Sequence, residues 1–166
     1  MLTGSVAASV HGAVRSTLDV DLVIDANVAQ LRALVESLTG PDVYVSAEAA
    51  AEALEHESTF NVVDTATGWK ADLIIRKSHP FSQSEFGRRR PIEFEGMKLW
   101  VATVEDIIIA KLEWAKLGES ARHVEDVAAL LRVAAGQLDQ AYVDRWIAEL
   151  DLNAQWQAVQ RMRGSN

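Results

Sequence analysis

Residues 18–24 read Leu18-Asp19-Val20-Asp21-Leu22-Val23-Ile24, which alternates two carboxylates with apolar side chains. Alternate residues of a β-strand point to opposite faces of a sheet, so Asp19 and Asp21 are expected to project together from one face, away from the apolar residues between them. Two adjacent carboxylates repel each other, a cost that a fold tolerates most easily when cations neutralise them. Oxygen ligands of this kind suit Mg²⁺, which keeps several waters and takes one or two carboxylates plus substrate phosphates.

A glycine-serine turn precedes this strand. Gly4 and Ser5 follow a short predicted strand and open a predicted helix over residues 5–11. Such a turn lets the backbone approach a phosphate, while the helix start presents free N–H groups at its positive end. The Ser5 hydroxyl can add a further phosphate contact. Arg15 could also contact phosphate, although an ordinary loop arginine is at least as consistent with the sequence.

The rest of the chain is expected to alternate between strands and helices and then to become helical only. Helices are expected to begin after Asn27 and after Ser46, and a short strand is expected at 43–45. Two hairpins are expected, one pairing 59–64 with 69–76 and the other pairing 92–94 with 98–101. From Thr103 onward only helical periodicity remains. The pattern predicts an α/β (α+β) fold: a mixed sheet flanked by helices over residues 1–102, and a helical C-terminal region over 103–166 packed on that core.

A third carboxylate lies on a later predicted strand, in Lys70-Ala71-Asp72-Leu73-Ile74-Ile75-Arg76. Asp72 shares a face with Lys70, Ile74 and Arg76. Taken alone, this segment is more typical of a strand with a charged, solvated face. The Asp-x-Asp strand upstream reverses that balance and makes Asp72 the candidate third member of the group.

The first helix of the C-terminal region carries a lysine on its apolar face. Thr103 and Asp106 resemble a capping box at the helix start. Lys111 falls near the middle of the face that should pack against other elements. An unpaired ammonium in a core is costly, so Lys111 must reach solvent or meet an anion. In the next helix, Asp126 is expected to have a structural role, orienting Lys111 or a nearby arginine.

Residues 76–90 are locally basic. Five of the sixteen basic residues lie here, including Arg88, Arg89 and Arg90, and Phe81 and Phe86 are interleaved with them. Pro80 and several serines favour a loop. Such a patch could grip a triphosphate or an RNA end with a ring available for stacking, or it could be a solvated loop, and the two interpretations carry equal weight.

Composition bounds the class of protein. The 166 residues suit one domain, or a core with a small appendage, and a 49% hydrophobic content is enough for a packed core. The absence of cysteine excludes disulfides and thiolate metal sites. No apolar run approaches membrane-spanning length, so a cytoplasmic protein is expected. The net charge of −8 argues against general affinity for nucleic acid without excluding a local basic site.

Together these motifs carry a family resemblance. Gly4-Ser5 with the string His11-Gly12-Ala13-Val14-Arg15-Ser16-Thr17-Leu18-Asp19-Val20-Asp21 resembles the signature of the polymerase-beta-type nucleotidyltransferases. The longer string is more similar to the minimal nucleotidyltransferases of bacterial toxin–antitoxin and phage-defence systems, the AbiEii/MenT-like group. The likeness continues through the Asp72 strand and through residues 101–131, where Arg122, Glu125, Asp126 and Leu130-Leu131 keep the family pattern.

The resemblance implies a nucleotidyltransferase core that moves a nucleoside monophosphate from an NTP, such as ATP, to a hydroxyl and releases pyrophosphate. It assigns Asp19, Asp21 and Asp72 to catalysis and to binding Mg²⁺. It assigns Gly4, Ser5, Lys111 and Arg15 to the nucleotide.

The same resemblance points to an acceptor and to a partner. The implied acceptor is RNA, such as a tRNA 3′ end, or a protein side chain, in a toxin–antitoxin setting with a cognate antitoxin. An antibiotic hydroxyl is the enzymatic alternative, and a degenerate, non-catalytic binding module of the same fold is the alternative outside enzymology.

Overall fold

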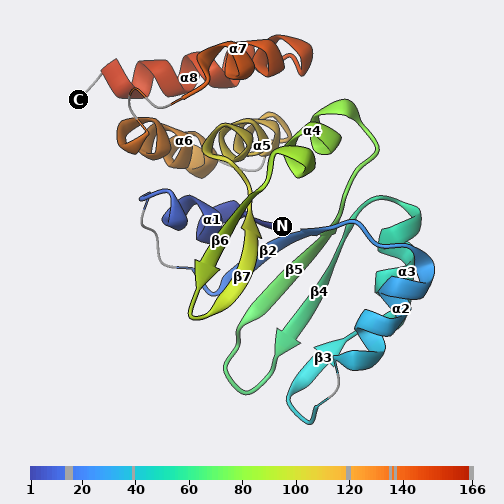
Figure 1. Cartoon of the computed structure of the whole chain (residues 1–166). Helices are drawn as coiled ribbons and strands as arrows, with labels where there is room; N and C mark the ends of the chain where they lie inside the picture. Colours follow the sequence, from blue (N-terminus) through green and yellow to red (C-terminus); the bar gives the residue numbers. More distant parts are fainter. Residues whose placement is uncertain (14–16, 39, 119–120, 135, 137, 165–166) are drawn as a thin grey trace. The chain divides into compact units, whose positions relative to one another are not determined.

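The structure is a computed structural model that describes residues 1–13, 17–38, 40–118, 121–134, 136 and 138–164. Within these residues, seven strands form one mixed sheet in the order β3-β4-β5-β2-β1-β7-β6 (Figure 1). The strands are β1 Leu2–Thr3, β2 Asp19–Ile24, β3 Val43–Val45, β4 Thr59–Asp64, β5 Lys70–Ile75, β6 Arg90–Phe94 and β7 Met97–Val101. The pairs β2–β5 and β1–β7 are parallel, and the other neighbouring pairs are antiparallel.

Helices account for most of the remaining described chain. Between the strands lie α1 Gly4–Val10, α2 Val28–Ser37, α3 Ala47–Glu55 and α4 Pro80–Arg88, and after β7 come α5 Val104–Lys116, α6 Ala121–Val133, α7 Gln140–Glu149 and α8 Asn153–Gly164. The predicted α/β fold, with a mixed sheet and helices followed by a helical C-terminal region, is therefore confirmed.

The chain divides into two compact units. The first contains all seven strands of the described chain, α2, α3, α4 and the first residues of α1, through Val6. The second begins at Ala7 in α1, leaves out the sheet and resumes at Ala102 with α5–α8.

In the first unit, α2 and α3 cover one face of the sheet. Asn27 caps α2 in a reciprocal capping box with Gln30, and the Ser46 side chain accepts a hydrogen bond from the Ala49 N–H at the start of α3, as the sequence predicted. Figure 1 shows the two helices together beside β4 and β5. They pack on alternate strand residues, and the resulting core consists of Leu31, Ala50, Ala53, Phe60, Leu73 and Ile75.

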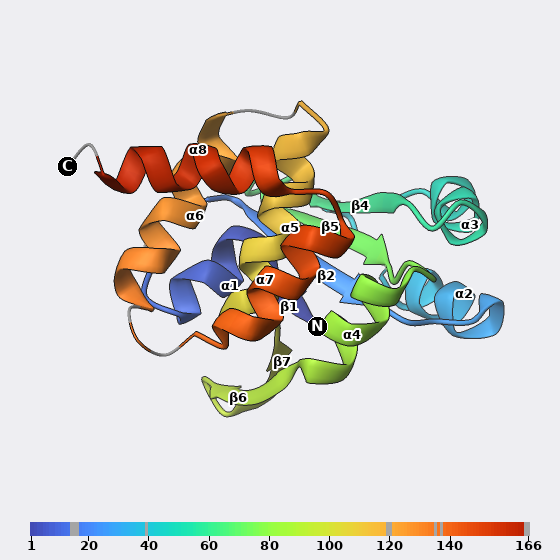
Figure 2. The same cartoon turned by 90° about the horizontal axis from the view of Figure 1, so that it is seen from above.

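The second unit is helical apart from its loops. Figures 1 and 2 show α8 lying along α6, and α7 beside α5. At the start of α5 the Thr103 hydroxyl donates to the buried Asp106 carboxylate at 2.6 Å, and the Asp106 N–H donates back to Thr103. Tyr142 of α7 donates its hydroxyl to the other Asp106 oxygen at 2.6 Å, which ties α5 to α7. The predicted cap at Thr103 is confirmed.

The prediction of a loop in the basic segment, residues 76–90, was wrong, because a helix, α4, occupies most of this segment. His79 is its N-cap and accepts a hydrogen bond from Ser82 N–H through Nδ1, and Pro80 occupies the first turn, where its missing N–H costs nothing. Phe81 is buried and only 1% exposed, so it belongs to the core and is not a stacking surface.

Candidate active site

The pairing of two parallel strands brings the predicted carboxylates together. β2 and β5 are in register, with Asp19 opposite Lys70 and Asp21 opposite Asp72. Directly opposed residues of neighbouring strands share a face, so all four side chains project from the same side of the sheet. The apolar residues between them point to the other side, where α2 and α3 pack. One face of these strands therefore forms the core, and the other carries the candidate site.

Gly4 lies against one member of this group. β1 pairs with β2 so that Thr3 is opposite Asp21, and the next residue, Gly4, turns the chain into α1 with a φ of +64°. A side chain at position 4 would have no room, because its Cβ would lie 1.8 Å from the Asp21 Oδ2. Only glycine combines this φ with so close an approach. Ser5 follows it in the first turn of α1.

A lysine and an amide hold Asp72. Lys70 Nζ lies 3.1 Å from Asp72 Oδ2 and 3.9 Å from Asp19 Oδ1. On the other side, Asn61 of β4 is directly opposite Asp72, and its amide donates a hydrogen bond to Asp72 Oδ1. The hydrogen bond to Asp72 is the main reason that the pKa of Lys70 is raised above its ordinary value, with the negative charges of Asp72, Asp19 and Asp21 adding to it against a smaller effect of burial.

Asn61 was not singled out in the sequence, and Lys70 was named there only as part of a charged strand face. The contact of Asn61 with Asp72 and the approach of Lys70 to Asp19 both depend on cross-strand register, which pairs β4 with β5 and β5 with β2. The one available signal was alternation: Asn61 is a polar residue between Phe60 and Val62 in a predicted strand, on the face opposite to the apolar one.

The side chains on this face include the kind of oxygen ligands that bind divalent cations. Asp19, Asp21 and Asp72 supply hard carboxylate oxygens from two adjacent strands, the type of ligand that Mg²⁺ prefers. As they stand, however, no group of three or more Asp, Glu or His residues among those described is arranged to hold a metal ion. The ammonium of Lys70 lies beside the carboxylates of Asp19 and Asp72.

The two remaining candidate nucleotide-binding residues are Lys111 and Arg15. Lys111 belongs to the second unit, where it is buried and its Nζ lies 2.7 Å from Asp126 Oδ2 of α6. The lysine therefore meets an anion instead of reaching solvent, and Asp126 orients it as predicted. Arg15 lies outside the described residues.

The basic segment forms an arginine–aromatic stack. The guanidinium of Arg89 lies 4.3 Å from the ring centroid of Phe86 and 5.0 Å from that of Trp100, and it also donates a hydrogen bond to the Phe86 carbonyl. Trp100 is 49% exposed, and Arg90 is exposed at the start of β6. Of the three predicted arginines, Arg89 is held by these rings, and the exposed aromatic surface comes from Trp100, which no sequence pattern had indicated.

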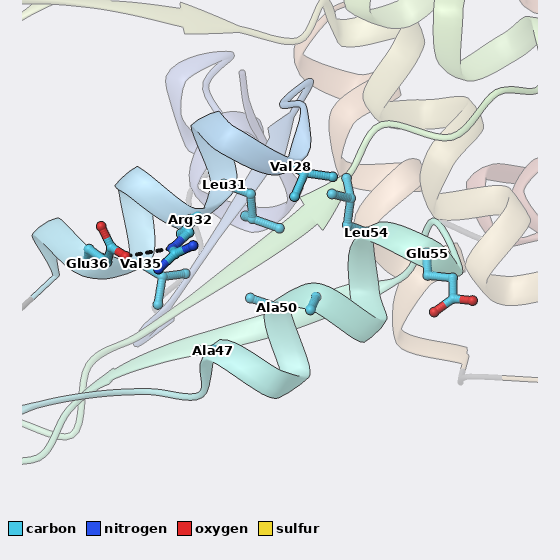
Figure 3. A pocket seen from close by; sticks show the side chains of 10 residues that line it. Val28, Leu31, Arg32, Val35, Glu36, Ala47, Ala50, Leu54 and Glu55 are labelled. Carbon is cyan, nitrogen blue, oxygen red and sulfur yellow. Dashed lines mark hydrogen bonds and ion pairs between the residues drawn. The ribbon is translucent and has the colours of Figure 1, made fainter.

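A separate groove lies between α2 and α3 (Figure 3). Its volume is about 690 Å³, and its lining is mainly apolar, with Arg32 and Glu36 paired at 2.8 Å on its rim. None of the candidate site residues lines it, because it belongs to the helices that cover the opposite face of the sheet.

Comparisons with known proteins assign no family to the chain. No known family matches it, and no curated protein does. Among solved structures it is similar to an antigenic nucleotidyltransferase-like protein from Paracoccidioides brasiliensis, with 17% identity and a TM-score of 0.46 over 95% of this chain and 83% of that one. A similarity at this level assigns no activity. Among the described residues, no helix combines the length and apolar character needed to cross a bilayer.

Proposed function

We propose that the chain is a Mg²⁺-dependent nucleotidyltransferase that moves a nucleoside monophosphate from an NTP to a hydroxyl acceptor. One observation carries the proposal: the register of β2 and β5 places Asp21 beside Asp72, with Gly4 packed against Asp21. Paired carboxylates on one sheet face, beside a glycine turn that begins a helix, are an arrangement suited to phosphoryl transfer.

The roles follow from the chemistry of each group. Asp19, Asp21 and Asp72 would hold Mg²⁺, which when bound polarises the α-phosphate and neutralises the departing pyrophosphate. Asp72 would also accept the proton of the acceptor hydroxyl, whose oxygen forms the new bond to the α-phosphorus as the bond to pyrophosphate breaks. Gly4 and Ser5 would approach the phosphates of the nucleotide, and Lys111 and Arg15 would add positive charge to them.

RNA is the acceptor class that the surface favours. The arginine–aromatic stack of Phe86, Arg89 and Trp100 leaves an indole half exposed beside the Arg89 guanidinium. Single-stranded nucleic acids bind surfaces that combine positive charge with stacking rings. A tRNA 3′ end in a toxin–antitoxin setting, with an antitoxin as partner, is the specific form of this proposal; protein and antibiotic hydroxyls are the other acceptors to test.

A second candidate function rests on Lys70. Its ammonium already satisfies Asp72 and approaches Asp19, so a protein with this fold that binds nucleotide or a partner without catalysis would need no metal. The two candidates differ in whether pyrophosphate is released.

The test is Mg²⁺-dependent NTP binding and turnover. Calorimetry with each NTP should show binding that requires Mg²⁺ and that Asp19→Asn with Asp21→Asn abolishes. The matched control is Glu48→Gln with Glu52→Gln, which removes the same charge from exposed positions of α3 and should leave binding unchanged. Pyrophosphate release that Asp72→Asn abolishes supports the enzyme. Equal NTP affinity in the folded Asp19/Asp21 variant contradicts the assignment, and binding without release favours the non-catalytic module.

A further inference from the structure

Lys70 occupies a special place among the carboxylates. It precedes Asp72 by two residues on β5 and lies opposite Asp19 on β2, so its side chain starts on the same face as both. Its Nζ lies 3.1 Å from Asp72 Oδ2 and 3.9 Å from Asp19 Oδ1. One ammonium therefore lies within ion-pair distance of two of the three residues that would hold a metal.

Asp72 is fully engaged by protein groups in this arrangement. Its Oδ2 faces Lys70, and its Oδ1 accepts the amide hydrogen bond of Asn61. A metal ion cannot take Asp72 Oδ2 at bonding distance while an ammonium lies against that oxygen, because the two cations would repel each other at close range. Binding of an ion by Asp72 and Asp19 thus requires that Lys70 move away.

Lys70 is also able to move. Its side chain is 36% exposed, compared with 6% for Lys111, and the four-carbon stem of a lysine is flexible. An ammonium with access to water regains hydration when it leaves such a pair, and partly exposed pairs are weak. Asn61 stays behind, so Asp72 keeps one hydrogen bond that fixes its orientation.

We propose that Lys70 is the resident cation of this site, which holds Asp19 and Asp72 in place without metal and which a divalent ion must displace. The inference rests on the proposed function, since it takes Asp19, Asp21 and Asp72 as the metal-binding residues. Its consequence is that the free ion binds poorly, because it competes with a charge that the protein itself supplies. A nucleotide improves the exchange by bringing phosphate oxygens that complete the coordination of the ion.

The experiment measures binding of Mn²⁺, as a probe for Mg²⁺, to the full chain without nucleotide, by electron paramagnetic resonance of the free ion. Lys70→Met should bind Mn²⁺ about tenfold more tightly than the wild type, the change expected from removing one nearby unit charge at a partly exposed site. Lys70→Arg keeps the charge and should stay within about twofold of the wild type. Lys98→Met removes the same charge from an exposed position of β7 and should also have no effect.

The outcomes separate the two claims. Mn²⁺ binding that is unchanged or weakened in folded Lys70→Met overturns the role of Lys70 while leaving the metal site intact. Binding that is absent from the wild type and from Lys70→Met alike overturns the role of Lys70, while the metal site and the proposed function are decided separately by the Mg²⁺-dependent NTP binding described above. A tenfold gain that Asp19→Asn cancels in the Lys70→Met background supports the displacement of Lys70 from these carboxylates.

Discussion

Two lysine–aspartate pairs in this protein share their chemistry and differ in their surroundings. Lys111 and Asp126 lie 2.7 Å apart between α5 and α6, with side chains 6% and 17% exposed. Lys70 and Asp72 lie 3.1 Å apart on the sheet, with side chains 36% and 20% exposed. Burial makes the first pair costly to break, because the partner left behind has no water to replace it. The second pair is available for exchange with another cation.

The largest effect should come from breaking the buried pair. Asp126→Ala leaves the Lys111 ammonium buried without its partner and should lower the free energy of unfolding by about 3 kcal/mol, as measured by urea denaturation. The double variant Lys111→Met with Asp126→Leu removes both charges and should recover most of that loss. A loss below about 1 kcal/mol in Asp126→Ala would mean that Lys111 finds water or another anion.

The recovered double variant also separates structure from function. It is expected to fold without the Lys111 ammonium, so its NTP affinity reports directly on whether that ammonium binds phosphate. An NTP affinity equal to that of the wild type would remove Lys111 from the nucleotide-binding residues and leave it with a purely structural role in the second unit.

A smaller effect should follow from changing the turn that adjoins Asp21. Gly4→Ala places a side chain at a φ of +64°, where a Cβ would lie 1.8 Å from Asp21 Oδ2, and should lower the free energy of unfolding by about 2 kcal/mol. The same substitution at Gly87, within α4, meets nothing within 4 Å and should stabilise the protein by up to about 1 kcal/mol. Thermal and urea unfolding of the two variants provide the measurement. Equal effects at both positions would show that the approach of Gly4 to Asp21 is not tight in solution.

The smallest effect should come from the exposed pair. Lys70→Met should change the free energy of unfolding by about 1 kcal/mol or less without added metal, because partly exposed ion pairs contribute little. Lys98→Met provides the baseline for losing a surface lysine. If Lys70→Met lowered the free energy of unfolding as much as Asp126→Ala, the Lys70–Asp72 pair would be as hard to break as the buried pair, and the proposed difference between the two pairs would be wrong.

Local signals predicted most of the fold. The caps at Asn27, Ser46 and Thr103 and the alternation of Asp19 and Asp21 each depend on residues a few positions apart, and all are present in the structure. Helix α4 was missed because serines and a proline also favour loops, and the value of Pro80 as a first-turn residue depends on the capping by His79.

Less of the candidate site could be predicted from such local sequence patterns. The type and face of Asp72 and of its same-strand neighbour Lys70 could be predicted, but its partners Asn61 and Asp21 follow from the register of three strands, which no single stretch of sequence contains. The same holds for Arg89 and Trp100, which meet because Arg89 leads directly into β6, the strand that pairs with β7. Pairing across strands is set by the whole core, so the sequence indicates candidates and the fold selects among them.

The alternation along β5 constrains where the gene can change length. Asp72 faces the site and its neighbour Leu73 faces the core, so inserting or deleting one codon within this strand would exchange the two and place a carboxylate among Leu31 and Phe60. The turn between β4 and β5, around Gly68, has open space beside it and carries no such constraint. Length variants that arise during divergence should therefore accumulate at this turn, while selection removes those within the strand.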